Sequence, residues 1–145
     1  MTSLRASAIA LLWACSGFGQ EAPHPANPAF QAMVRDAKTR IREIDAAQLK
    51  TWLDSPDKLL LIDVREDSEW QAGHAAAATH LSRGILDARI ESAAPEKAAR
   101  IVLYCHSGAR SALAADTLRK MGYRNVFSLA GGFQSYQSAG LPVQK

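Results

Sequence analysis

Residues 101–120 read IVLYCHSGARSALAADTLRK, and this stretch decides the fold class. It begins with a short apolar run, Ile101 to Tyr104, which is typical of a strand covered on both faces. After a loop, apolar residues recur at helical spacing from Leu113 to Met121, and Gly122 suits the left-handed cap that ends a helix. A strand that leads directly into a helix is the repeating unit of a parallel sheet.

The same alternation extends in both directions along the chain. Strands are predicted at residues 41–44, 59–64, 78–81 and within 125–132. Helices are predicted at residues 45–53, 68–72, 84–93 and 133–140. Asp45, with Gln48 three residues later, forms a capping-box pattern at the first of these helices. The chain is therefore expected to belong to the α/β class, with a central parallel β-sheet flanked by helices on both faces and sites at the carboxyl ends of the strands, where Cys105 falls.

An extra helix is expected before the first strand. Residues 21–28, EAPHPANP, contain three prolines and no apolar periodicity, so they are interpreted as an extended linker. Asn27 followed by Pro28 is a favourable helix start, and the helix is expected to continue to about Lys38 on the outside of the domain. Its apolar face is predicted to consist of Phe30, Met33, Val34 and Ala37.

The first residues have the layout of an export signal. Arg5 precedes an apolar stretch from Ala6 to Ala14 that is too short to span a bilayer. A signal peptide is expected over about residues 1–20, with a cleavage position after Gly19. Alternatively, LWAC at residues 12–15 resembles a lipobox, with residues 1–14 removed and Cys15 lipidated. The expected location is thus periplasmic or otherwise exported, with a lipid anchor at Cys15 in the second route.

Charge and cysteine content narrow the function further. The net charge is +3, and no Lys/Arg-rich block suggests a nucleic-acid partner. With Cys15 removed or lipidated, Cys105 is the only thiol of the mature domain, so no internal disulfide is expected. No Cys/His cluster has metal-ligand spacing, and neither a metal nor a cofactor is expected. The sequence gives no indication of the oligomeric state.

The loop CHSGAR, residues 105–110, is predicted to bind an anion through its backbone N–H groups. A chain that turns from a strand into a helix directs several backbone N–H groups inward, and Gly108 relieves the strain of a positive φ. The helix dipole adds positive charge at the same place, which favours a thiolate at Cys105. Arg110 can hold the loop or face an incoming anion, and Ser107 can donate a hydrogen bond to the sulfur.

The chain resembles the rhodanese-like sulfurtransferases. CHSGARS at residues 105–111 is similar to their active-site pattern, and LIDVRE (61–66), EWQAGH (69–74) and VFSLAGGFQSYQSAGLP (126–142) match the family's other markers in order and spacing. The resemblance implies a single rhodanese domain at residues 41–145, after a linker and helix at 21–40. It also implies that Cys105 accepts a sulfane sulfur as a persulfide and passes it to a thiol or cyanide acceptor.

The resemblance also implies roles for the neighbours of Cys105. The substrate-binding residues would be His106, Ser107, Gly108, Ala109 and Arg110, whose amides would cradle the sulfur. Arg65 matches an arginine that lies near the substrate in some members, although an ion pair beneath the sheet is an equally good interpretation of it. His106 departs from the arginine that is frequent in members using thiosulfate, and a histidine attracts a dianion less strongly.

Three other functions are weighed against sulfur transfer. Phosphatases and arsenate reductases share the fold, but their loop between cysteine and arginine is one residue longer than the four residues that separate Cys105 from Arg110. Non-catalytic rhodanese modules used for binding or regulation usually lack the cysteine that this chain keeps. A Cys/His hydrolase would need a histidine beside Cys105, whereas His24, His74 and His80 have no spacing that places one there.

Overall fold

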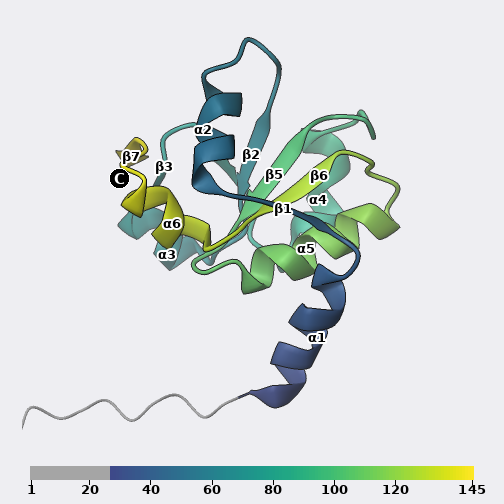
Figure 1. Cartoon of the computed structure of the whole chain (residues 1–145). Helices are drawn as coiled ribbons and strands as arrows, with labels where there is room; N and C mark the ends of the chain where they lie inside the picture. Colours follow the sequence, from purple (N-terminus) through teal and green to yellow (C-terminus); the bar gives the residue numbers. More distant parts are fainter. Residues whose placement is uncertain (1–26) are drawn as a thin grey trace, which may run out of the picture.

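The computed structural model describes residues 27–145 (Figure 1). The predicted export signal, the cleavage position after Gly19 and the lipid on Cys15 all lie outside these residues. Within residues 27–145, no helix is long and apolar enough to cross a membrane.

The core of the domain is a five-stranded sheet in which every pairing is parallel. Its strands lie in the order β1-β6-β5-β2-β4. Their bounds are Arg42–Ile44 for β1, Leu60–Asp63 for β2, Ala78–His80 for β4, Ile101–Tyr104 for β5 and Val126–Leu129 for β6. The prediction of an α/β fold with a central parallel sheet is confirmed, and all five strands fall within the ranges expected from the sequence.

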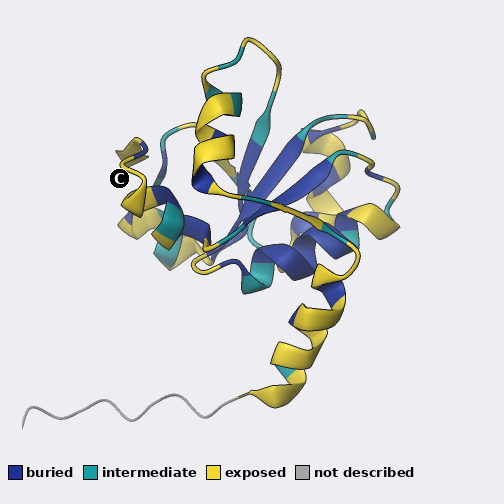
Figure 2. Cartoon of the chain, viewed as in Figure 1, coloured by how far each residue is buried: buried dark blue, intermediate teal, exposed yellow. Residues whose placement is uncertain are grey.

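Helices cover both faces of this sheet, and its central strands are buried along their length (Figure 2). The alternation of side chains along each strand decides which helices they face. Ile101 and Leu103 of β5 face α4 (Leu86–Ala93) and α5 (Ala109–Lys120). Val102 and Tyr104 face the opposite way, toward α2 (Ala46–Leu53) and α6 (Gly132–Ser138). All four residues of β5 are buried, as the apolar run predicted.

The predicted helix starts are present, with one correction. Asn27 Oδ1 accepts the Phe30 N–H at 3.0 Å at the start of α1 (Pro28–Lys38), and Asp45 Oδ1 accepts the Gln48 N–H at 2.8 Å at α2. The Gln48 side chain is exposed and, among the described residues, forms no return bond, so the capping box predicted there is only half made. A full capping box instead opens α3 (Asp67–Ala72).

Helix α1 docks on α5 and extends away from the sheet (Figure 1). Val34 and Ala37 are buried against Ala112 and Leu113. Met33, predicted on the buried face, is 57% exposed, because α5 covers only a narrow stripe of α1.

A second, two-stranded sheet was not predicted. β3 (His74–Ala75) pairs antiparallel with β7 (Val143–Gln144), so the last residues of the chain lie beside the end of α3. Strands of two residues are too short to give a periodic signal in sequence. This small sheet borders the groove that lies beside Cys105.

Candidate active site

Cys105 lies at the carboxyl end of β5, where the chain turns into α5. It is only 1% exposed and belongs to the apolar cluster that also contains Leu103 and Ala114. His106 and Ser107 are exposed, whereas Gly108 is buried. The cysteine thus forms the floor of the loop, and the two following residues form its outer rim.

The sulfur of Cys105 receives a backbone hydrogen bond. The Gly108 N–H donates to Cys105 Sγ at 3.1 Å, and Gly108 adopts φ +100°, a conformation that favours glycine. Gly108 is also the residue that precedes α5, so the sulfur lies at the positive end of a helix of 12 residues. Both features place positive partial charge beside the sulfur. Among the described residues, the bond to the sulfur comes from the Gly108 amide, one of the loop amides expected to cradle it, and the Ser107 hydroxyl makes none.

A second segment holds the loop from the side. The N–H groups of Phe133 and Gln134 donate to the carbonyls of Cys105 and His106, at 2.7 and 3.2 Å. This contact requires Gly132, because a Cβ there would overlap the Cys105 carbonyl oxygen and lie 2.7 Å from that of His106. The start of α6 is therefore part of the site. Residues 126–142 matched a marker of the family, but none of them was predicted to belong to the site, because a glycine pair by itself indicates a turn.

Arg110 is held by Glu69 of α3. Its Nη1 and Nη2 donate to the two oxygens of the Glu69 carboxylate at 2.7 and 2.8 Å, a two-point ion pair. This contact lowers the pKa of Glu69 from 4.5 to about 2 and raises the pKa of Arg110. Of the two roles foreseen for Arg110, holding the loop is the one these contacts describe. Glu69 was not singled out from the sequence.

Arg65 lies inside the domain. It is 3% exposed, pairs with Asp63 at 2.7 Å and donates to the Gly73 carbonyl at 2.7 Å. Its guanidinium also lies 4.1 Å from the centre of the Phe133 ring. The ion pair foreseen as one interpretation of Arg65 is thus present, and the same residue reaches the groove described below.

A groove of about 460 Å³ opens beside the loop, on the side of β7. Ala72, Phe133 and Val143 form its apolar part, while Gln137 and Lys145 contribute polar groups. Arg65, Glu69, Gly73 and His106 complete its lining. The groove thus connects the rim of the cysteine loop with the small second sheet.

The sequence model of the Rhodanese-like domain family matches residues 45–139, which include the cysteine loop and every residue that contacts it here, but not Val143 and Lys145 of the groove. The chain belongs to the rhodanese-like domain family. A sulfurtransferase of Allochromatium vinosum is 32% identical over 103 residues, covering 71% of this chain and 94% of that protein. Thiosulfate sulfurtransferase GlpE of Coxiella burnetii is 32% identical over 93 residues, covering 63% of this chain and 85% of the relative.

Other relatives of this rhodanese-like domain are longer. The chain spans 24% of the length of one curated relative and 51% of another. Among solved structures, a Rhodopseudomonas palustris protein of unknown function, described as a possible tyrosine phosphatase, superposes with a TM-score of 0.72 at 27% identity. The match covers 84% of this chain and 98% of that protein's chain.

Two histidines of the rhodanese-like domain, His74 and His80, lie against backbone carbonyls, and His106 lies on the rim of the cysteine loop. His74 Nδ1 lies 3.1 Å from the Trp70 carbonyl oxygen, and the His74 ring stacks on the Trp70 ring at 3.5 Å. His80 Nε2 lies 2.9 Å from the Arg65 carbonyl oxygen. No group of His, Cys, Asp and Glu within residues 27–145 could hold a metal ion.

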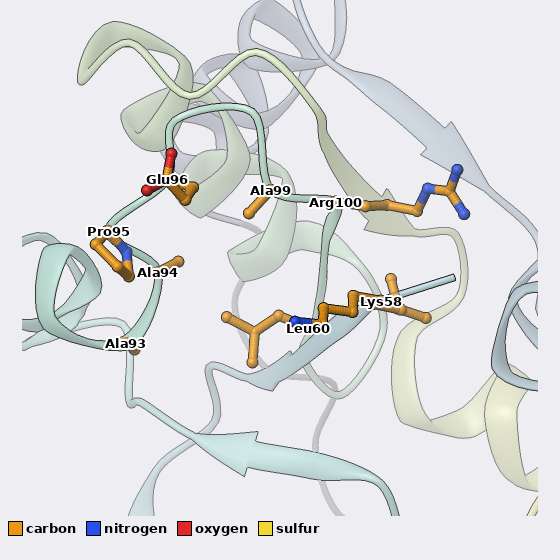
Figure 3. Close-up of a pocket in the computed structure, with 9 residues that line it drawn as sticks. Lys58, Leu60, Ala93, Ala94, Pro95, Glu96, Ala99 and Arg100 are labelled. Carbon is orange, nitrogen blue, oxygen red and sulfur yellow. The ribbon is translucent and has the colours of Figure 1, made fainter. Parts of the chain in front are cut away.

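A larger hollow, of about 590 Å³, lies at the opposite end of the sheet, where β2 and β5 begin (Figure 3). Leu60, Ala94 and Ala99 contribute apolar surface to it. The side chains of Arg100 and Glu96 point away from its centre in this view. Because the lining of this hollow has no cysteine, serine or histidine, the cysteine loop is the candidate active site.

Proposed function

We propose that this rhodanese-like domain is a sulfurtransferase that carries a sulfane sulfur on Cys105. The relatives named sulfurtransferase support sulfur transfer in general. The observation that carries the specific mechanism is the hydrogen bond from the Gly108 N–H to Cys105 Sγ at the start of α5. It provides a nucleophilic sulfur with a partner for its negative charge at the point where the chemistry has to occur.

In the first step the Cys105 thiolate attacks the sulfane sulfur of a donor. A bond forms between Sγ and that sulfur, and the bond between the sulfane sulfur and the rest of the donor breaks with its electron pair. The donor leaves as an anion, sulfite in the case of thiosulfate, and Cys105 becomes a persulfide. The loop amides and the helix dipole act on the negative charge that is now on the outer sulfur.

In the second step an acceptor thiolate or cyanide attacks the outer sulfur. The new bond forms between acceptor and outer sulfur, while the bond to Sγ breaks and returns its electron pair to Cys105. Neither step needs an oxidant or a reductant. Because Cys105 is the only free cysteine of the described residues, the acceptor has to come from outside the domain.

The loop length supports sulfur transfer over phosphoester chemistry. Four residues separate Cys105 from Arg110, and one further residue would add up to about 3.5 Å of chain to the ring of amides. The shorter ring suits a single sulfur atom, and the longer one suits a tetrahedral oxyanion. The retained cysteine likewise supports catalysis over a purely binding role.

The decisive experiment compares wild type with Cys105→Ser. The wild-type protein is incubated with thiosulfate, mercaptopyruvate, glutathione persulfide or polysulfide and examined by mass spectrometry under non-reducing conditions. We expect one added sulfur on Cys105, transfer to cyanide or a dithiol, and neither in the serine variant. Sulfur transfer by Cys105→Ser with an intact fold would refute the mechanism.

A second experiment tests the loop length. Inserting one residue between Gly108 and Arg110 is expected to weaken sulfur transfer and to admit hydrolysis of an aryl phosphate. If the insertion changes neither activity, the size of the ring does not determine the chemistry. If the wild-type chain hydrolyses the phosphate faster than it transfers sulfur, the phosphatase assignment is the correct one.

We also propose that the protein acts outside the cytoplasm, on the basis of its N-terminal sequence. Mass analysis of the soluble exported fraction and of the membrane fraction tests this proposal. A free N-terminus after Gly19 supports signal-peptide cleavage, and a lipidated Cys15 supports the lipoprotein route. An intact Met1 in a cytoplasmic fraction contradicts both.

A further inference from the structure

We infer that the groove between the cysteine loop and β7 binds the organic part of a low-molecular-mass persulfide or thiol that carries an anionic group. The inference rests on the proposed function and specifies its substrate class. It assigns the discrimination between sulfur compounds to Val143 and Lys145, which lie outside the part of the chain that matches the family.

The groove is large enough for an organic molecule. A volume of about 460 Å³ falls within the range of sites that enclose organic ligands, about 300–1,000 Å³. An inorganic sulfur donor of a few atoms would fill only a small part of it. A molecule with a carbon skeleton could keep its sulfur at the loop and still occupy the groove.

The apolar surface that the groove offers a ligand comes mainly from Val143 on β7. Val143 is 43% exposed, one of the few large apolar side chains of the described residues that remain open to solvent. Phe133, which also lines the groove, is 6% exposed, and the Arg65 guanidinium lies 4.1 Å from the centre of its ring. Apolar contact of this kind is gained by a ligand with methylene groups and by no inorganic anion.

The lining of the groove includes a cation that no described side chain neutralises. Two of its other charged residues are already paired, Arg65 with Asp63 and Glu69 with Arg110. Among the described residues no side-chain carboxylate forms an ion pair with the Lys145 ammonium, which lines the β7 end of the groove. The exposed His106 lies at the end near the cysteine. A carboxylate on the ligand would therefore find a cation at the β7 end, away from the reacting sulfur.

Geometry connects the groove to the chemistry. The Phe133 N–H donates to the Cys105 carbonyl at 2.7 Å, so the residue that lines the groove also holds the cysteine loop. His106, the residue after the nucleophile, belongs to the lining as well. A ligand in the groove thus lies directly beside the rim over which a sulfur must pass to reach Cys105.

The test uses the whole chain and two donors, glutathione persulfide and thiosulfate. We expect Val143→Asp to lower kcat/KM for glutathione persulfide about tenfold, through a higher KM, because it removes apolar contact and adds a repelling charge. Lys145→Glu is expected to act in the same direction. With thiosulfate both variants are expected to stay within about twofold of wild type.

Two matched variants complete the design. Val143→Ile keeps an apolar wall and is expected to retain the activity with glutathione persulfide. Met33→Asp makes the same change as Val143→Asp at a residue that is 57% exposed on α1 and absent from the groove, and is expected to change neither donor's kinetics. Thermal unfolding of each variant checks that β7 remains in place, and Lys145→Glu serves as the main test if Val143→Asp unfolds.

Two outcomes would overturn the inference. Equal losses with both donors would mean that β7 supports the fold and does not select the substrate, and no loss with either donor would mean that the groove stays empty during the reaction. Both can be told apart from failure of the proposed function, since in that case wild-type Cys105 would accept no sulfur from any donor.

Discussion

The carboxylate of Glu69 ties two helices together at the edge of the cysteine loop. It accepts the Arg110 guanidinium at 2.7 and 2.8 Å, and its Oε2 also accepts the Glu66 N–H at 3.1 Å as part of the capping box of α3. The start of α3 and the start of α5 are therefore fixed to one side chain. Glu69 touches neither the sulfur nor any reacting atom, so its influence on the reaction runs through Arg110.

We predict that Glu69→Gln lowers kcat/KM for sulfur transfer about tenfold while the persulfide still forms on Cys105. A two-point charged contact is replaced by a weaker one, and the loop loses part of its positioning. Steady-state kinetics measure the change. Glu91→Gln is the control, since it makes the same change in the exposed ion pair with Lys97 and should leave the kinetics unaltered. Equal kinetics for wild type and Glu69→Gln would show that Arg110 needs no such partner.

The same ion pair predicts how stability depends on pH. Arg110 lowers the pKa of Glu69 from 4.5 to about 2 in the folded state, so the pair stabilises the fold above pH 4.5 and loses this contribution as the pH falls toward 2. The difference in free energy of unfolding between wild type and Glu69→Gln should therefore shrink over this window. Denaturant titrations at pH 7, 4 and 2.5 measure it, and a difference that stays constant with pH would contradict the prediction.

Much of the site could be predicted because its chemistry is local in sequence. The apolar run before Cys105 indicated a buried strand, and in a parallel sheet the end of such a strand is where a ligand binds. Gly108 at a positive φ followed from the same local pattern. Glu69 could not be found in this way, since its partner lies 41 residues further along the chain and an acidic residue near the start of a helix is usually explained by capping alone.

The contribution of residues 131–145 was the hardest to predict. The glycine pair before α6 suggested only a turn, although Gly132 is the point where α6 approaches the backbone of the cysteine loop. β7 has two residues and pairs with a strand of two residues, and strands this short show no alternating apolar pattern from which they could be predicted. Both contacts depend on how the chain returns to the site, which composition and spacing do not encode.

We predict that Gly132→Ala destabilises the fold and abolishes sulfur loading. Its Cβ would overlap the Cys105 carbonyl oxygen, and a φ of +57° adds about 1–2 kcal/mol of strain for an alanine. Gly140→Ala is the matched control, because its φ of +69° carries similar strain while nothing lies within 4 Å of the added carbon. Denaturant unfolding and mass spectrometry of the loaded protein measure the two effects. Similar losses for both variants would mean that strain alone, and no close approach, explains the requirement for glycine.

We predict that Asp116→Asn loosens α1 without affecting the reaction. Asp116 is 5% exposed and accepts two hydrogen bonds from Arg40, at 3.0 and 2.9 Å, just beyond the end of α1. The variant weakens this link, so amide hydrogens of α1 should exchange faster while sulfur loading stays at the wild-type level. Asp54→Asn, which alters an exposed pair with Lys50, should change neither. Unchanged exchange in Asp116→Asn would assign the docking of α1 to Val34 and Ala37 alone.

Because Cys105 is buried, the resting protein and the protein loaded with a sulfur differ in which sulfur atom is most accessible. With 1% of the residue exposed, Cys105 lies below the exposed His106 and Ser107, and a donor has to cross this rim to reach Sγ. A sulfur bonded to Sγ lies about 2 Å from it. In the loaded protein the reactive atom is the sulfur taken from the donor, while the Cys105 sulfur is bonded to it and buried below the rim. Oxidants are therefore expected to react with the outer sulfur, which the next acceptor removes, before they react with the sulfur of Cys105.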